Sequence, residues 1–153
     1  MVHIRLMREE DHSFILDLAS RFLDFPQPAW RDQEKMLEAQ KRLAREAISG
    51  KPAGSKLYVA EDQSGKLLGY LLIGEVSDFF TQEKKGFIYG LAVAKEAEGK
   101  GIGQMLMNYA EKWAKERGYD QVALSVFANN HRARSLYEKL GFEVETMSMV
   151  KSL

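Results

Sequence analysis

The chain has 153 residues, 22 of them basic and 22 acidic, and it contains no cysteine. The cancelling charges exclude bulk electrostatic attraction to nucleic acid or to an anionic membrane. The missing cysteine excludes disulfides, thiolate metal sites and a cysteine nucleophile. A hydrophobic share of 45% with 29% charged residues is typical of a globular protein, and no apolar run approaches the roughly 18 residues of a membrane span. We therefore expect residues 1–153 to form a single cytoplasmic domain.

The first third of the chain predicts a short strand and two helices. The strand covers His3 to Met7, and the first helix carries apolar residues at helical spacing, namely Phe14, Ile15, Leu18, Ala19 and Phe22. Pro26 and Pro28 end this helix, because proline interrupts helical hydrogen bonds. The second helix is expected over about Arg31 to Ile48, with the apolar residues Met36, Leu37, Leu43 and Ala47.

A hairpin is expected after the second helix. Its strands are predicted at Leu57 to Ala60 and at Leu67 to Val76, on either side of the turn Asp62-Gln63-Ser64-Gly65. We interpret the polar segment from Asp78 to Lys85 as a connection long enough to be a mobile loop.

The stretch from Gly86 to Gly118 organises the rest of the chain. It opens with an apolar run typical of a mostly buried strand, namely Phe87, Ile88, Leu91, Ala92 and Val93. After a turn that contains Gly99, Lys100 and Gly101, apolar residues recur on one helical face for more than three turns: Ile102, Met105, Leu106, Tyr109, Ala110, Trp113 and Ala114. Gly118 is placed to end that helix in a left-handed conformation.

A strand that turns through glycines into a helix is suited to bind an anion. The first helical N–H groups have no internal partner, the helix dipole is positive there, and glycine lets a phosphate approach the backbone. A P-loop would place Ser or Thr after Gly99-Lys100, where this chain has Gly101, so we reject that interpretation. A dinucleotide fingerprint has weak support, because no glycine stands at position 104 or 106 and Asp120 precedes a strand rather than ending one.

The end of the chain predicts three more elements. A strand at Gln121 to Phe127 is followed by a helix from about Ala133 to Leu140, which ends at Gly141, and by a last strand from Phe142 to Lys151. The predicted order is β-α-α-β-β-β-α-β-α-β, which is a mixed α/β sheet and not a doubly wound one.

Two separated motifs resemble the GNAT superfamily of N-acetyltransferases. The family's first pattern is a strand ending in Val, followed by Arg/Gln-x-x-Gly-x-Gly/Ala at the start of a helix. This chain has Val93 and then Glu98-Gly99-Lys100-Gly101-Ile102-Gly103. The second pattern, Asn-x-x-Ala-x-x-x-Tyr-x-x-x-Gly-Phe, is matched by Asn130, Ala133, Tyr137, Gly141 and Phe142. The predicted element order is also that of the GNAT fold, and the departure is Glu98, where the family usually has Arg or Gln.

The resemblance implies an acetyl-CoA site beside central strands that splay apart. The turn from Glu98 to Gln104 would hold the pyrophosphate through backbone N–H groups, with Lys100 adding charge or facing solvent. The strand Leu91-Ala92-Val93 would bulge near Val93 and pair its free backbone groups with the pantetheine arm. The same free N–H would polarise the thioester carbonyl. The side chains of this strand would still pack in the core.

The second motif implies roles for three residues. Asn130, together with Ala133, would contact the pantetheine or shape the loop beneath it, and a helix cap is the alternative for Asn130. Tyr137 would line the donor site and act as the general acid, because a tyrosine with a pKa near its usual ~10 is protonated at neutral pH and can donate to the departing thiolate. The alternative for Tyr137 is a core aromatic residue.

The general base is left open by the sequence. Many relatives carry an acid near the positions of Tyr89 and Gly90, and this chain has none there. Glu75 and Asp78 are the remaining candidates, each with an exposed ion pair as its alternative, and a water chain is a third possibility.

The resemblance predicts an acetyl-CoA-dependent N-acetyltransferase that acts on a primary amine of a small molecule or a protein, with homodimerisation expected only at the family level. Neither nucleic acid nor a membrane is an expected partner. His3, His12 and His131 have no ligand or triad spacing, so no metal is expected. A non-catalytic acyl-CoA-binding or sensor module stays open because of Glu98, and a nucleotide-binding α/β protein is disfavoured by the absent motifs.

Overall fold

The sheet is mixed and has five strands. The computed structural model, which describes residues 1–153, has the strand order β1-β2-β3-β4-β5. The first four strands pair antiparallel, and β5 joins β4 in parallel. The strands are β1 (His3–Leu6), β2 (Lys56–Glu61), β3 (Leu67–Ser77), β4 (Lys84–Val93) and β5 (Val122–Leu124). The predicted mixed α/β sheet is confirmed.

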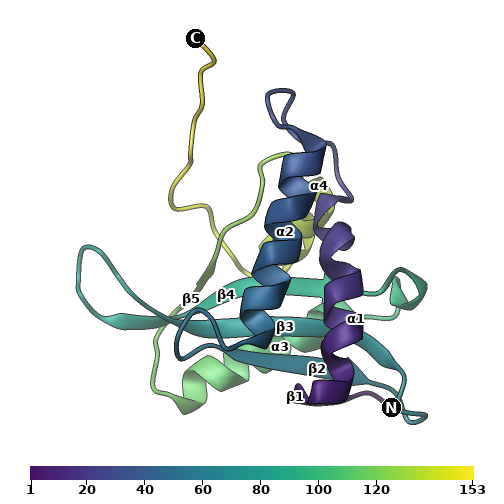
Figure 1. Cartoon of the computed structure of the whole chain (residues 1–153). Helices are drawn as coiled ribbons and strands as arrows, with labels where there is room; N and C mark the ends of the chain where they lie inside the picture. The colour runs from purple at the N-terminus through teal and green to yellow at the C-terminus, as the bar shows by residue number, and fades with distance from the viewer.

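Helices cover both faces of this sheet (Figure 1): α1 and α2 lie on one face, and α3 lies on the other. The helical segments are η1 (Glu9–Asp11), α1 (His12–Asp17), η2 (Leu18–Leu23), α2 (Gln33–Ile48), η3 (Lys95–Ala97), α3 (Ile102–Glu116) and α4 (His131–Lys139). The first predicted helix therefore continues from α-helical into 3-10 geometry before it ends ahead of Pro26. No helix combines the length and the apolar character needed to cross a membrane.

The core lies on both faces of the central strands. Its α3 layer is the predicted stripe with one exchange: Met107 is fully buried, whereas Met105 is 41% exposed. Met107 is buried because it lies closer to the middle of the stripe formed by Ile102, Leu106, Ala110, Trp113 and Ala114. In α2 the buried residues are the small Ala44 and Ala47, and the predicted core residue Leu43 is exposed.

The connection between β3 and β4 is a compact turn instead of the long loop predicted. β4 begins at Lys84, so only residues 78–83 connect the strands. The Asp78 carboxylate accepts hydrogen bonds from the N–H groups of Phe80 and Thr81 and from Lys85 Nζ at 3.1 Å. These bonds lower the pKa of Asp78 to about 2, and they hold the turn together.

The predicted last strand, Phe142 to Lys151, does not form. Helix α4 ends at Lys139, Gly141 follows the C-cap Leu140 with a φ of 96°, and the Phe142 N–H donates to the Tyr137 carbonyl at 2.9 Å. The Phe142 ring also packs on Tyr137, so the helix end engages the first residue of the predicted strand. The predicted strand Gln121 to Phe127 is likewise shortened to the three residues of β5, which leaves little edge to pair with. Residues 143–153 extend from the body as unpaired chain (Figure 1).

A buried ion pair ties β1 to the first helical turn. Asp11 is 2% exposed, and Arg5 donates to both of its carboxylate oxygens, at 2.7 and 3.1 Å. The Arg8 N–H donates to the same carboxylate at 2.7 Å, and Glu61 on β2 accepts a further bond from Arg5 at 3.1 Å. The hydrogen bonds from Arg5 hold the pKa of Asp11 below its usual range.

Asp11→Asn should destabilise the protein by about 3 kcal/mol at pH 7, because it removes the buried carboxylate of the pair and leaves Arg5 with only the more exposed Glu61 as an acidic partner. Urea denaturation measures this difference. The folded pKa of Asp11 is lowered, so its stabilisation is present above the unfolded pKa of ~4 and is lost as the pH falls through the folded value. The difference in the free energy of unfolding between wild type and variant should therefore become smaller below about pH 4. The more exposed Glu61→Gln is the control with a smaller effect, and a pH-independent gap for Asp11→Asn would contradict this account.

Candidate functional site

The strand β4 has neighbours on both sides only at its beginning. β3 pairs with it as far as Val93, whereas β5 pairs only with residues 86–88. The Ala94 N–H donates to the carbonyl of Leu68 in β3, at 2.8 Å. Because backbone direction alternates along a strand, the backbone groups of Leu91 and Val93 point away from β3. The second half of β4 therefore has an open edge, which agrees with the predicted splay of the central strands.

The bulge in β4 lies at Tyr89, not near Val93 as predicted. The register of β3 against β4 passes from Ile88 to Gly90 and leaves Tyr89 as the additional residue. The Tyr89 ring lies over Gly74, where a Cβ would be 2.9 Å from it. Because Gly74 has no side chain, the Tyr89 ring has room at this position, and the additional residue of the bulge is accommodated there.

The turn between β4 and α3 is built on two glycines. Gly99 and Gly101 have φ of 77° and 75°, a region that other residues adopt at a cost, and Gly101 is the N-cap of α3 with no side-chain cap. The first bond of the helix runs from the Met105 N–H to the Gly101 carbonyl at 3.0 Å, and none of the six N–H groups from Gly99 to Gln104 has a partner. Such a row of free donors at the positive end of a helix can bind an anion.

Helix α4 lies beside this turn and brings the second motif to the first. Gly103 allows the approach: a Cβ there would lie 3.5 Å from Leu136 of α4 and 3.9 Å from Val93. Asn130 caps α4, because its side-chain oxygen accepts from the Ala133 N–H at 3.3 Å. The cap that was an alternative for Asn130 is therefore present. The structure thus gathers the end of β4, the glycine turn and the start of α4 at one corner.

Tyr137 follows Leu136 on α4 and is half-buried. Burial raises the pKa of its hydroxyl above the ordinary value of 10, and no hydrogen bond contributes to that shift. The hydroxyl is therefore protonated at neutral pH. Its ring packs on Phe142 and against the core, as in the core-aromatic alternative, and its hydroxyl has no hydrogen-bond partner.

The carboxylate of Glu98, at the start of the turn, already has two arginine partners. Its carboxylate accepts a hydrogen bond from Arg21 of η2 and lies 3.1 Å from Arg132 Nη1 of α4. Arg21 and then Arg132 lower the pKa of Glu98. Sequence reasoning missed both arginines: Arg21 lies 77 positions away, and the signal for Arg132 is only its place two residues after Asn130. Of the other residues of the turn, Ile102 is buried, and Lys100 and Gln104 are exposed.

The two candidate bases lie outside this corner. Glu75 pairs opposite Gly86, seven residues of β4 from Val93, which is roughly 23 Å along a strand. Its carboxylate accepts from the Tyr119 hydroxyl and lies 3.7 Å from Lys84 Nζ. Asp78 lies in the turn beyond β3 with the partners described above. Both carboxylates therefore have structural partners, and the geometry brings neither to the turn.

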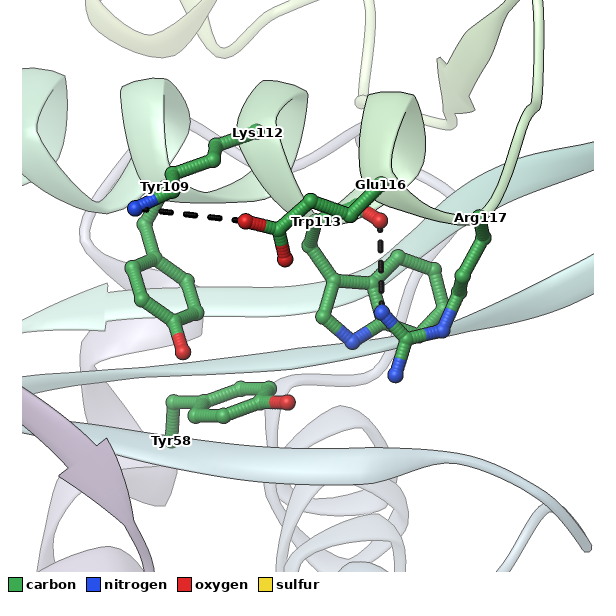
Figure 2. A pocket seen from close by; sticks show the side chains of 6 residues that line it. All are labelled: Tyr58, Tyr109, Lys112, Trp113, Glu116 and Arg117. Carbon is green, nitrogen blue, oxygen red and sulfur yellow. Dashed lines mark hydrogen bonds and ion pairs between the residues drawn. The ribbon is translucent and has the colours of Figure 1, made fainter.

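A separate cavity of about 290 Å³ lies under the other end of α3 (Figure 2), lined by Tyr58, Tyr109, Lys112, Trp113, Glu116 and Arg117. The Arg117 guanidinium lies 3.7 Å from the centre of the Trp113 ring, and the rings of Tyr58 and Tyr109 are 4.8 Å apart. The Tyr58–Tyr109 contact joins α3 to β2, whereas the Arg117–Trp113 contact lies within the C-terminal end of α3. The cavity is therefore separate from the glycine turn, which precedes the N-terminus of α3.

Comparison with known proteins assigns the chain to a family. The sequence profile described as the acetyltransferase (GNAT) family matches residues 14–142. The chain belongs to this family, as the two motifs predicted.

The relatives agree with that assignment. YdgE, an uncharacterized N-acetyltransferase of Bacillus subtilis, is 27% identical over 126 residues, which cover 81% of this chain and 78% of the relative. A solved structure from Pyrococcus furiosus, provisionally named an acetyl transferase, is 29% identical with a TM-score of 0.76, and both chains are covered fully. A ribosomal-protein-alanine N-acetyltransferase of Brucella melitensis shares the fold over the whole of both chains, with 19% identity and a TM-score of 0.71.

Proposed function

We propose that the protein is an acetyl-CoA-dependent N-acetyltransferase that acetylates a primary amine of a small molecule or a peptide. The observation that carries this proposal is the row of six unpartnered N–H groups from Gly99 to Gln104 beside the open edge of β4. A diphosphate at the row and an extended arm along the edge are the two parts of a CoA thioester. Family membership supports the same donor.

The donor would be held mainly by backbone groups. The turn would bind the diphosphate, and the free backbone groups of Leu91 and Val93 would pair with the pantetheine arm like an added strand. The Val93 carbonyl already accepts from Arg21 Nε at 3.0 Å, so the Val93 N–H and the groups of Leu91 remain for this pairing. Asn130 and Ala133 shape the loop that closes the corner.

The chemistry would be a direct acyl transfer. The amine nitrogen attacks the thioester carbonyl, a free N–H of the β4 edge stabilises the negative charge that develops on the carbonyl oxygen, and the C–S bond breaks. Tyr137 then donates its hydroxyl proton to the departing thiolate, and the new amide loses its extra proton to water. Because Glu75 and Asp78 are both engaged by structural partners, the proposal assigns no carboxylate as the base.

The acceptor is defined here only as a primary amine. The fold is shared with a ribosomal-protein-alanine N-acetyltransferase and with a glucosamine-6-phosphate N-acetyltransferase of Arabidopsis thaliana, so the fold alone accommodates different acceptors. We propose a cytoplasmic location, as the sequence predicts. Light scattering would measure whether the protein forms a homodimer.

Saturating acetyl-CoA should raise the thermal midpoint of the protein by several degrees, and NAD should not. A ligand at 100 times its dissociation constant adds about 2.7 kcal/mol of stability, which is roughly 5–10 °C for a domain of this size. Differential scanning fluorimetry measures the shift, and a thiol-release assay on a panel of amines follows without background from protein thiols. No shift would contradict the donor site. A shift without turnover on any amine would indicate the non-catalytic binding module instead.

Gly101→Glu should abolish acetyl-CoA binding, because it places a side chain and a negative charge in the row of N–H groups. Gly118→Glu is a matched control at the other end of α3: its φ of 77° is close to the 75° of Gly101, and neither Cβ would meet an atom within 4 Å. Both variants should therefore lose similar stability, about 1 kcal/mol. Calorimetric titration should show binding lost only in the first, and equal affinities in the two would contradict the assignment.

Tyr137→Phe should lower kcat by roughly 100-fold and leave the Kd for acetyl-CoA nearly unchanged, since a general acid acts on the transition state. Steady-state kinetics and titration give the two quantities. Tyr119→Phe is the control, because that hydroxyl bonds Glu75 away from the turn, and its kcat should equal that of wild type. An unchanged kcat for Tyr137→Phe would remove Tyr137 from the mechanism.

A further inference from the structure

The carboxylate of Glu98 joins three elements at the mouth of the glycine turn. Glu98 precedes Gly99 directly, Arg21 reaches it from η2, and Arg132 reaches it from α4. An unpaired carboxylate at this position would repel a phosphate that approaches the six free N–H groups. Because Arg21 and Arg132 both pair with it, Glu98 instead holds the exposed Arg132 guanidinium beside those groups, while Asp24 balances the charge of Arg21.

The two arginines are not equivalent. Every side-chain nitrogen of Arg21 has an acceptor: Nε donates to the Val93 carbonyl, Nη1 to Asp24 and Nη2 to Glu98. Its side chain is 18% exposed, so it is a fixed anchor between η2 and the end of β4. Arg132 has Glu98 as its ion-pair partner, and its side chain is 74% exposed. The guanidinium of Arg132 therefore keeps free donors that face solvent next to the turn.

We propose that Arg132 is a phosphate-binding residue of the donor site and that Glu98, anchored by Arg21, is the residue that positions it. Arg132 would supply from α4 the phosphate-binding side chain that the family pattern, with Arg or Gln, places at position 98. This inference rests on the proposed function, because it assumes that a CoA thioester binds at the turn. A planar guanidinium suits the role, since it can keep one bond to Glu98 and direct its other N–H groups to phosphate oxygens.

Arg132→Ala should weaken CoA binding by roughly tenfold, which is the loss expected for a charge-assisted hydrogen bond. Arg134→Ala is the matched control: Arg134 lies two residues on in the same helix, loses the same charge, and is engaged by Glu138 and the Ala128 carbonyl. Its Kd should stay within about twofold of wild type. The dependence of the binding constant on salt should also become less steep only in Arg132→Ala.

The ligand series tests whether the contact is to phosphate. Titrations of both variants use CoA, 3′-dephospho-CoA and pantetheine, which has no phosphate. If the weakening in Arg132→Ala disappears with 3′-dephospho-CoA, the contact is to the 3′-phosphate. If it persists with 3′-dephospho-CoA and disappears with pantetheine, the contact is to the diphosphate. An equal weakening for all three ligands indicates a structural effect of the substitution and overturns the proposal.

Glu98→Gln tests the positioning role, since it keeps the shape and removes the charge. It should weaken CoA binding in the wild-type background and have little effect in the Arg132→Ala background, because the two residues act as a unit. A carboxylate that only repels the donor predicts the opposite sign, a tighter complex in both backgrounds, and that result would overturn the positioning role. If the wild-type protein binds CoA but Arg132→Ala equals it, only this inference fails. If the wild-type protein binds no CoA, the proposed function fails.

Discussion

The loss of a neighbour by β4 after Ile88 is the constraint on which the site depends. A strand in the middle of a sheet has no backbone groups to spare, and a strand at an edge is exposed along its whole length. β4 is central where it meets β5 and becomes an edge where β5 ends at Leu124. The open length therefore lies inside the molecule, between covered faces, and it leads directly to the glycine turn.

The glycine turn between β4 and α3 adds further backbone groups that have no hydrogen-bond partner. Because Gly99 and Gly101 take left-handed conformations, the chain reverses into α3 without a side chain at the helix start, and six N–H groups remain free. The buried stripe of α3 fixes that helix to the sheet, so the free groups have a fixed orientation. The same packing that stabilises the core thus also holds these free N–H groups in place.

Much of this could be predicted from the sequence, because the signals are local. The glycines, the α3 stripe and the helix end at Gly118 are set by neighbours within a few residues, and both motifs were placed correctly on their elements. The tertiary features were not accessible. The bulge at Tyr89 depends on space over Gly74, the last strand is absent because Phe142 folds onto Tyr137, and the partners of Glu75 and Asp78 come from other segments. No pattern along the chain specifies these contacts.

Glu98 shows why a departure from a motif is a weak argument when only the chain is available. In the sequence it is an acid at a position where a phosphate should bind, and it favoured a disabled site. In the structure it accepts from Arg21 and pairs with Arg132, so the local charge is set by residues from η2 and α4. A motif position records which side chain follows the strand, whereas an anion responds to the sum of charges around it. The proposed donor site is therefore a property of the corner where three elements meet, and a substitution in one of them is interpretable only together with the other two.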